Sequence, residues 1–192
     1  LLDEAGKRAR AIIKEKNPNL ADADEVARQV GLGAIKYFDL SHNRRSDIAF
    51  RWDDALSFEG NTGPYLQYTH ARLKSILRKA KVESSTLTLP LSKRGRETTA
   101  ASFPLPQKGE GEDGGFTLDP IEHRLVAMIL RFPEAIEDAL ADYAPHILAH
   151  YLYQLASAAN EFYHSHPVLQ EGDEKIRGMR LVIVEGVALT LR

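Results

Sequence analysis

The sequence predicts an all-α protein with one short strand, and two observations carry the helical prediction. Apolar residues recur at helical spacing through most of the chain. Four prolines stand where the first turn of a helix is expected, namely Pro64, Pro120, Pro133 and Pro145. One stretch, residues 48–52, alternates apolar and polar side chains and is expected to form a short strand.

Two helices are expected near the start of the chain. The first covers residues 1–16, and its apolar face consists of Leu1, Leu2, Ala5, Ala9, Ile12 and Ile13. The second begins near residues 22–24, where acidic side chains suit the positive end of a helix, and runs to about residue 38. Its apolar stripe consists of Val26, Val30, Ala34, Ile35 and Phe38. A loop over residues 41–47, the short strand and one helical turn over residues 53–57 follow.

A glycine-rich turn then runs directly into a third helix. Pro64 suits the first helical position because its missing N–H would have had no partner within the helix. Thr62 or Asn61 is expected to cap the free amides before it. The chain has no Gly-x-x-x-x-Gly-Lys-Ser/Thr run. Gly60, Gly63 and Pro64 are therefore interpreted as residues that shape the turn, not as a phosphate cradle.

This third helix carries aromatic and basic side chains that suit RNA. Tyr65 and Tyr68 are three residues apart and so share a face, and Arg72 lies four residues beyond Tyr68. Lys74 and Arg78 follow on the same helix. Two rings and several cations on one rigid element favour contact with unpaired bases and phosphates. The alternative is that the tyrosines belong to the core and the cations to a solvated face.

The distribution of charge along the chain agrees with an RNA-binding interpretation. The net charge of the 192 residues is −2. Residues 44–96, however, carry eleven basic and five acidic side chains, whereas residues 97–192 carry seven basic and fifteen acidic ones. A polyanion is therefore expected to be steered toward the middle of the chain. The absence of cysteine excludes disulfides and thiolate metal sites and suits a cytoplasmic protein. No apolar run is long enough to span a membrane.

Residues 84–115 differ from the rest of the chain. Half of these positions are Ser, Thr, Pro or Gly, and no apolar period is sustained. They are interpreted as a flexible, dispensable surface insertion. The alternative is an RNA-binding arm that uses Lys93, Arg94 and Arg96.

The remainder of the chain is expected to be mainly helical. Helices are predicted over residues 120–130, 134–142 and 146–163, and one face of the last consists of Leu148, Leu152, Leu155, Ala159 and Phe162. Residues 174–192 are ambiguous, because Val182, Ile183 and Val184 favour a strand while the wider apolar spacing permits a helix. His146 and His150 are spaced like half of a zinc site, but no glutamate or third ligand accompanies them. No metal site and no catalytic residues are expected.

Residues 58–72 resemble one protein family in particular. The run Phe-Glu-Gly-Asn-Thr-Gly-Pro-Tyr-Leu-Gln-Tyr-Thr-His-Ala-Arg is similar to the arginyl-tRNA synthetases, where it marks the passage from the catalytic domain to the helical anticodon-binding domain. A second, collinear set of segments agrees with it, at residues 131–134, 151–156, 160–163 and 167–169. The resemblance covers roughly residues 1–80 and 119–192.

The resemblance implies a division into two regions. Residues 1–57 would be the helical end of the catalytic region, and residues 58–192 an anticodon-binding bundle of five helices that includes the insertion. It implies a helix for residues 174–192. It also places the anticodon against the helix after Pro64, so that the expected tRNA-binding residues are Tyr65, Tyr68, Arg72, Arg78, Gln67 and Lys74.

The family joins arginine to its tRNA with ATP, and the resemblance implies that activity for the parent protein. The His-x-Gly-His and Lys-Met-Ser-Lys motifs of that chemistry do not occur here. The chain is therefore expected to begin after the active site of a longer protein, to be inactive alone and to hold no cofactor. Its expected partners are the anticodon stem-loop of tRNA and the catalytic domain of the same chain, as a monomer. The alternative is a stand-alone helical module that binds another protein.

Overall fold

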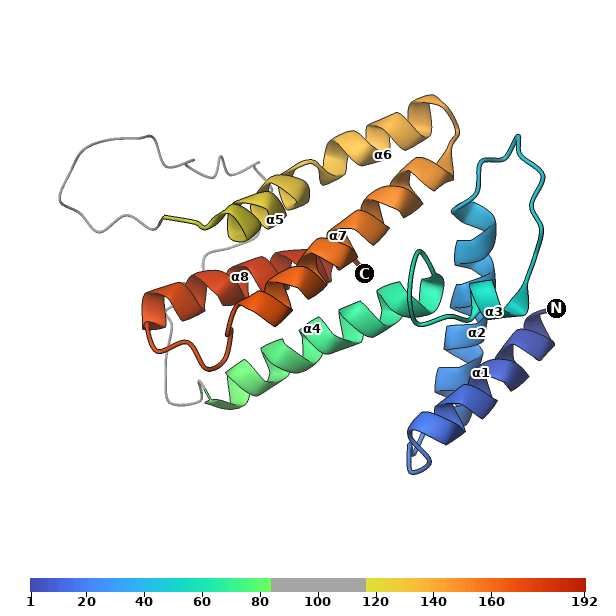
Figure 1. Cartoon of the computed structure of the whole chain (residues 1–192), viewed down its shortest axis with the longest axis horizontal. Helices are drawn as coiled ribbons and strands as arrows, with labels where there is room; N and C mark the ends of the chain where they lie inside the picture. Colours follow the sequence, from blue (N-terminus) through green and yellow to red (C-terminus); the bar gives the residue numbers. More distant parts are fainter. Residues whose placement is uncertain (84–116) are drawn as a thin grey trace, which may run out of the picture.

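The computed structural model describes residues 1–83 and 117–192. Within these ranges the regular structure is entirely helical, which confirms the all-α prediction. The residues expected to form an insertion, 84–115, lie outside the described residues. The helices are α1 (Leu2–Lys16), α2 (Ala23–Leu40), α3 (Trp52–Ala55), α4 (Gly63–Glu83), α5 (Pro120–Leu130), α6 (Phe132–Ala141), α7 (Pro145–Ser165) and α8 (Glu174–Thr190) (Figure 1).

The first two helices form a closely packed pair. A Cβ on Gly31 of α2 would lie only 2.6 Å from the carbonyl carbon of Ala5 in α1, so the two backbones touch where glycine stands. Ala9, Ala27 and Ala34 are buried between the helices. Small residues thus set the spacing of the pair, while Val26 and Val30 pack at its edge.

The predicted strand at residues 48–52 is wrong. Residues 48–51 have no ladder partner, and α3 begins at Trp52. The alternation instead places Phe50 and Trp52 together, with ring centroids 4.9 Å apart. Phe50 also packs edge-to-face on Phe38 of α2, at 5.0 Å. The alternation of apolar and polar side chains does place Phe50 and Trp52 on the same side of the segment. Their rings contact each other, and Phe50 contacts α2, without any strand pairing.

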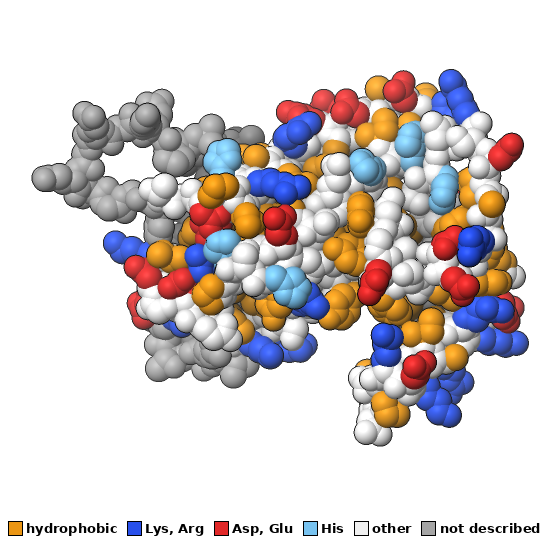
Figure 2. Space-filling view, viewed as in Figure 1, with side chains coloured by type: hydrophobic (Ala, Val, Ile, Leu, Met, Phe, Trp, Pro, Cys, Tyr) orange, Lys and Arg blue, Asp and Glu red, His pale blue; other side chains and the backbone are white. Residues whose placement is uncertain are grey.

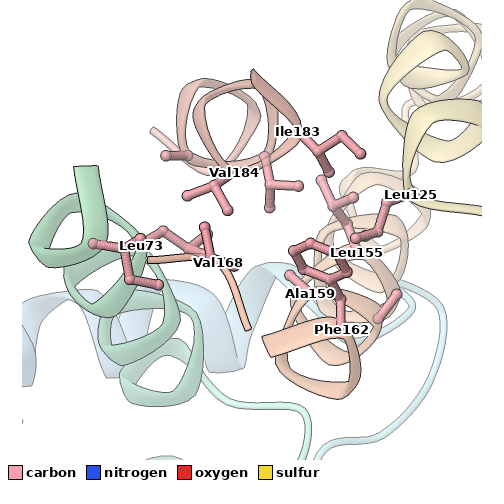
Figure 3. Packing of buried hydrophobic residues seen from close by; sticks show 12 residues of the cluster. Leu73, Leu125, Leu155, Ala159, Phe162, Val168, Ile183 and Val184 are labelled. Carbon is pink, nitrogen blue, oxygen red and sulfur yellow. The ribbon is translucent and has the colours of Figure 1, made fainter. Parts of the chain in front are cut away.

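Helices α4 to α8 form the predicted five-helix bundle. Its core brings together side chains from α4, α5, α7 and α8, and Figure 3 shows them pointing toward one another. Phe162, Leu125 and Leu155 are almost completely buried. The ambiguous segment at residues 174–192 is the helix α8, and it presents Ile183, Val184, Val187 and Ala188 to this core. Val182 is exposed, so only Ile183 and Val184 of the β-branched run contribute to the core.

A buried ion pair fixes the end of the bundle where α5 begins. Asp119 caps α5, and its side chain accepts hydrogen bonds from the amides of Ile121 and Glu122. Glu122 completes a capping box and also accepts from Arg180 Nε of α8 at 2.8 Å. Arg180 Nη1 in turn donates to the carbonyl oxygen of Pro167. The segment between α7 and α8 is thereby held against the bundle.

The helix pair and the bundle meet where α2 crosses the start of α4 and α7. The Tyr37 hydroxyl lies 2.6 Å from Asn61 Oδ1 and 2.8 Å from the carbonyl oxygen of Ala149. Burial raises the pKa of Tyr37. Arg44 extends the junction by donating to the carbonyl oxygens of Asp142 and Tyr143, after α6. None of the described helices has the length and apolar character that crossing a membrane requires.

Candidate nucleic-acid interface

A groove of about 690 Å³ lies between α4 and the segment that ends α7 and leads toward α8. Figure 1 shows this segment beside the last turns of α4. The groove is lined by Tyr68, Arg72, Ser75, Ile76, Lys79, Tyr163, His164, Ser165, His166, Pro167, Val168, Leu169 and Gln170. This described lining contains two cationic side chains and two histidines but no carboxylate. Figure 2 shows acidic side chains over α6 and also around the start of α8.

The turn before α4 places the helix for this groove. Thr62 Oγ1 accepts from the Tyr65 amide at 3.2 Å and donates to the carbonyl oxygen of Ser57, so Thr62 provides the cap. Gly60 has φ 79°, a left-handed conformation that favours glycine. A Cβ on Gly63 would lie 2.7 Å from the carbonyl oxygen of Gly33 in α2. The turn therefore requires glycine for conformation at one position and for close approach at the other.

Arg72 is held between two tyrosine rings at the mouth of the groove. Its guanidinium carbon lies 4.6 Å from the ring centroid of Tyr68 and 5.2 Å from that of Tyr163. Arg72 also donates to the Tyr68 hydroxyl and, at 3.0 Å, to Asn160 Oδ1. Tyr68 is 47% exposed and Tyr163 is 40% exposed. Both rings thus keep a large part of their surface available to a ligand.

Tyr65 has different surroundings from Tyr68. Its side chain is half-buried between α4 and α7, and its ring lies 5.7 Å from that of Tyr153. Its hydroxyl accepts from Asn160 Nδ2 at 2.9 Å. The two tyrosines predicted to act together are therefore separated by their packing.

The other predicted side chains lie on several faces of α4. Gln67 Nε2 donates to the carbonyl oxygen of Gln29 in α2, so Gln67 belongs to the junction with the helix pair. Lys74 and Arg78 are exposed and lie outside the groove lining. Arg78 Nη2 donates to Ser75 Oγ at 3.3 Å, a contact within the helix. The structure thus brings Tyr68 and Arg72 together and leaves Lys74 and Arg78 on the neighbouring surface.

Three residues of the site carried no prediction: Asn160, Tyr163 and Lys79. Asn160 and Tyr163 are three apart in α7 and so share a face, which was visible in the sequence. What the spacing did not indicate is that this face meets the face of α4 that carries Arg72. Lys79 is seven residues beyond Arg72, so the helical period returns it to the same side.

One group near the groove has the composition of a metal site. Asp119, Glu122 and His166 have ligand atoms within 4.8 Å of one another. Each carboxylate oxygen, however, already has a partner within the protein. Asp119 accepts from two amides and contacts His166, while Glu122 accepts from Arg180 and from the Asp119 amide. Burial raises the pKa of Asp119, but the amide hydrogen bonds and His166 outweigh it, so that pKa is lowered overall. These contacts account for the cluster as a structural network.

Comparison with known proteins matches both regions of the chain. Residues 66–192 match the family described as DALR anticodon binding domain, and residues 1–52 match the family described as tRNA synthetases class I (R), catalytic domain. The whole chain is 39% identical to the arginine--tRNA ligase of Alkaliphilus metalliredigens, of which it covers 29%. It is 41% identical to that of Thermococcus kodakarensis and covers 27% of it.

Two solved structures have the same arrangement of helices. Arginyl-tRNA synthetase of Thermus thermophilus matches 99% of this chain with a TM-score of 0.76 and 38% identity. The enzyme of Plasmodium falciparum matches 100% with a TM-score of 0.74 and 27% identity. The chain spans 29% and 30% of these two proteins.

Proposed function

Because the chain belongs to the DALR anticodon binding domain family, we propose that it recognises the anticodon stem-loop of a tRNA as one part of an arginine--tRNA ligase. The observation that carries this proposal is the stack of Tyr68, Arg72 and Tyr163 beside a groove whose described lining contains no carboxylate. Such a stack offers exposed aromatic faces and a fixed positive charge within one short stretch of surface.

These groups suit the bases of a single-stranded loop. Unstacked bases pack on aromatic side chains, and each such contact contributes about 1–3 kcal/mol to binding. Tyr68 and Tyr163 provide the faces, and Arg72 provides a cation that hydrogen-bonds phosphate or a base edge. The floor of the groove is partly apolar because Ile76, Val168 and Leu169 line it. That floor favours the ring of a base over a bare phosphate.

The remaining predicted residues receive supporting roles in this proposal. Lys74 and Arg78 lie exposed on α4 and would contact the backbone of the RNA. Tyr65 and Gln67 would act mainly by holding α4 against α7 and α2, since their polar atoms already engage those helices. Direct contact is therefore assigned to Tyr68, Arg72, Lys74 and Arg78, with Tyr163 and Lys79 added to them.

The catalytic activity is assigned to a part of the protein outside this chain. Residues 1–52 match the catalytic-domain family, but the two nucleotide-binding motifs of the chemistry are absent from the sequence. ATP would thus be a substrate of the parent enzyme and not a ligand of this chain. We place the parent in the cytoplasm, where protein synthesis consumes charged tRNA, and expect it to act as a monomer.

The test is binding of an RNA hairpin that carries the anticodon loop of an arginine tRNA. We expect Tyr68→Ala to weaken binding by ~1–3 kcal/mol with little change in salt dependence, because a stacking contact is lost and no charge. The matched control is Tyr143→Ala, since Tyr143 is 80% exposed in the turn between α6 and α7. Equal affinities of the parent and a folded Tyr68→Ala variant would refute this role for the stack.

A further inference from the structure

Asn160 of α7 connects three side chains of α4 through one amide group. Its Nδ2 donates to the Tyr65 hydroxyl and to Thr69 Oγ1, both at 2.9 Å. Its Oδ1 accepts from Arg72 Nη1 at 3.0 Å. Thr69 is fully buried, so this connection lies at the protected contact between the two helices.

The hydrogen-bond chemistry of the neighbours fixes the orientation of this amide. Thr69 Oγ1 donates its single hydrogen to the carbonyl oxygen of Tyr65, so toward Asn160 it can only accept. A guanidinium has donors and no acceptor, so the atom of Asn160 that faces Arg72 must be the oxygen. The amide therefore has one satisfactory orientation, and that orientation directs an acceptor at Arg72.

The partners of Arg72 differ from those of most other arginines in the described chain. Seven arginines form ion pairs with carboxylates, namely Arg8, Arg10, Arg28, Arg51, Arg124, Arg131 and Arg180. Arg72 has no carboxylate partner among the described side chains, those of residues 1–80 and 117–192, and is held by an amide, a hydroxyl and two rings. Its position is restrained although its charge is not neutralised.

We propose that Asn160 is a positioning residue for Arg72, and that its lack of charge keeps the guanidinium available to RNA. The inference rests on the proposed function and deepens it. A carboxylate at this position would also accept from Arg72 but would cancel the charge that attracts a phosphate. Two of the five N–H groups of Arg72 are engaged within the described residues, which leaves three for an RNA phosphate or base edge.

The decisive variant is Asn160→Asp, which keeps the size and the acceptor toward Arg72 and adds a negative charge, but loses the donor to Tyr65 and Thr69. Asn160→Ala loses the same donor without adding charge, so the difference between the two variants reports the charge. Binding of the hairpin is measured as a function of salt concentration. We expect the salt slope to fall by about one unit, to the value of Arg72→Ala, because one counterion fewer is released in each case. The matched control is Gln154→Glu, the same chemical change at an exposed position of α7. We expect Gln154→Glu to leave the slope near that of the parent.

A second variant, Asn160→Ala, tests positioning without added charge. We expect it to weaken hairpin binding about 10-fold, since a hydrogen bond to a charged group is lost. The effect should largely vanish in an Arg72→Ala background, because the two residues act as a unit. Additive effects of the two substitutions would overturn the inference, as would a parent-like salt slope in Asn160→Asp.

Positioning can also be measured without RNA. The Nε–H resonance of Arg72 should be displaced by the rings of Tyr68 and Tyr163 in the parent. We expect it to keep that position in Asn160→Asp and to move to that of a solvated arginine in Asn160→Ala. An unchanged resonance in Asn160→Ala would overturn the positioning role. Failure of the parent to bind the hairpin would instead overturn the proposed function and the argument about charge, while this resonance would still decide the positioning.

Discussion

Removal of the Arg180 side chain should destabilise the bundle strongly, because it leaves Glu122 buried without its counterion. Glu122 is 3% exposed, and the side chain of Arg180 is 11% exposed. Breaking such a pair from one side costs about 3–5 kcal/mol. We therefore expect Arg180→Met to lower the free energy of unfolding by that amount, measured by urea denaturation followed by circular dichroism.

The same reasoning predicts a rescue. Arg180 also pairs with Glu171 at 2.6 Å, but Glu171 is more exposed than Glu122. Adding Glu122→Gln to Arg180→Met removes the more deeply buried of the two unpaired charges and keeps a side chain that can complete the capping box with Asp119. The double variant should recover at least half of the loss, since replacing both partners of a buried pair is often nearly neutral. A control is Arg124→Met, whose partner Glu161 is 3.4 Å away and exposed. It should cost no more than about 1 kcal/mol.

Two results would refute this account of the ion pair. The first is a loss below about 1 kcal/mol for Arg180→Met, the range of an exposed pair. The second is a double variant no more stable than the single one. If the account holds, Arg180→Met should also weaken hairpin binding, because Arg180 holds the carbonyl oxygen of Pro167 in the wall of the groove.

Further expectations concern two glycines, one carboxylate and the activity of the whole chain. Gly31→Ala should destabilise the protein by about 1–3 kcal/mol in urea denaturation, because its Cβ would lie 2.6 Å from the backbone of Ala5, whereas Gly178→Ala, in an open stretch of α8, should stabilise it by up to about 1 kcal/mol. In the folded protein burial raises the pKa of Asp119, but the amide hydrogen bonds and His166 lower it more, so it lies below that of the unfolded chain. This gives stability that is present above the unfolded pKa and lost as pH falls through the folded pKa. Asp119→Asn should therefore reduce the acid-induced loss of stability, and equal pH profiles would contradict the assignment. The purified chain should show no arginine-dependent ATP–pyrophosphate exchange, and activity above a blank would contradict the location of catalysis outside it.

Much of the fold could be predicted because its helices carry local signals. The prolines at 64, 120, 133 and 145 each lie in the first two positions of a helix, and the apolar period covers the segments between. The strand prediction for residues 48–52 was wrong because alternation indicates only which side chains share a face. It does not indicate whether a second strand lies beside the segment to pair with it. Periodicity alone also left residues 174–192 open, since a β-branched run of three fits both a strand and a helix that is buried on one side.

The site was predictable only where it is local. Tyr68 and Arg72 are four residues apart on one helix, and their contact follows from helical geometry. The contact of Arg72 with Asn160 spans 88 residues and depends on how α4 crosses α7. Tyr65 illustrates the converse. The sequence spacing placed Tyr65 on the same face as Tyr68. In the structure α7 covers the hydroxyl of Tyr65, whereas the hydroxyl of Tyr68 lies at the groove.

Helix α4 connects the two regions of the chain mechanically. Its first turn touches α2 where Gly63 approaches Gly33, and Arg72 lies nine residues later, about 14 Å along the axis. Between them Gln67 contacts α2 and Thr69 contacts α7, so the intervening turns are held on both sides. The part of α4 that carries Arg72 therefore keeps a defined position relative to α2 and α7. Under the proposed function, an anticodon loop bound at the groove would also be positioned relative to residues 1–52.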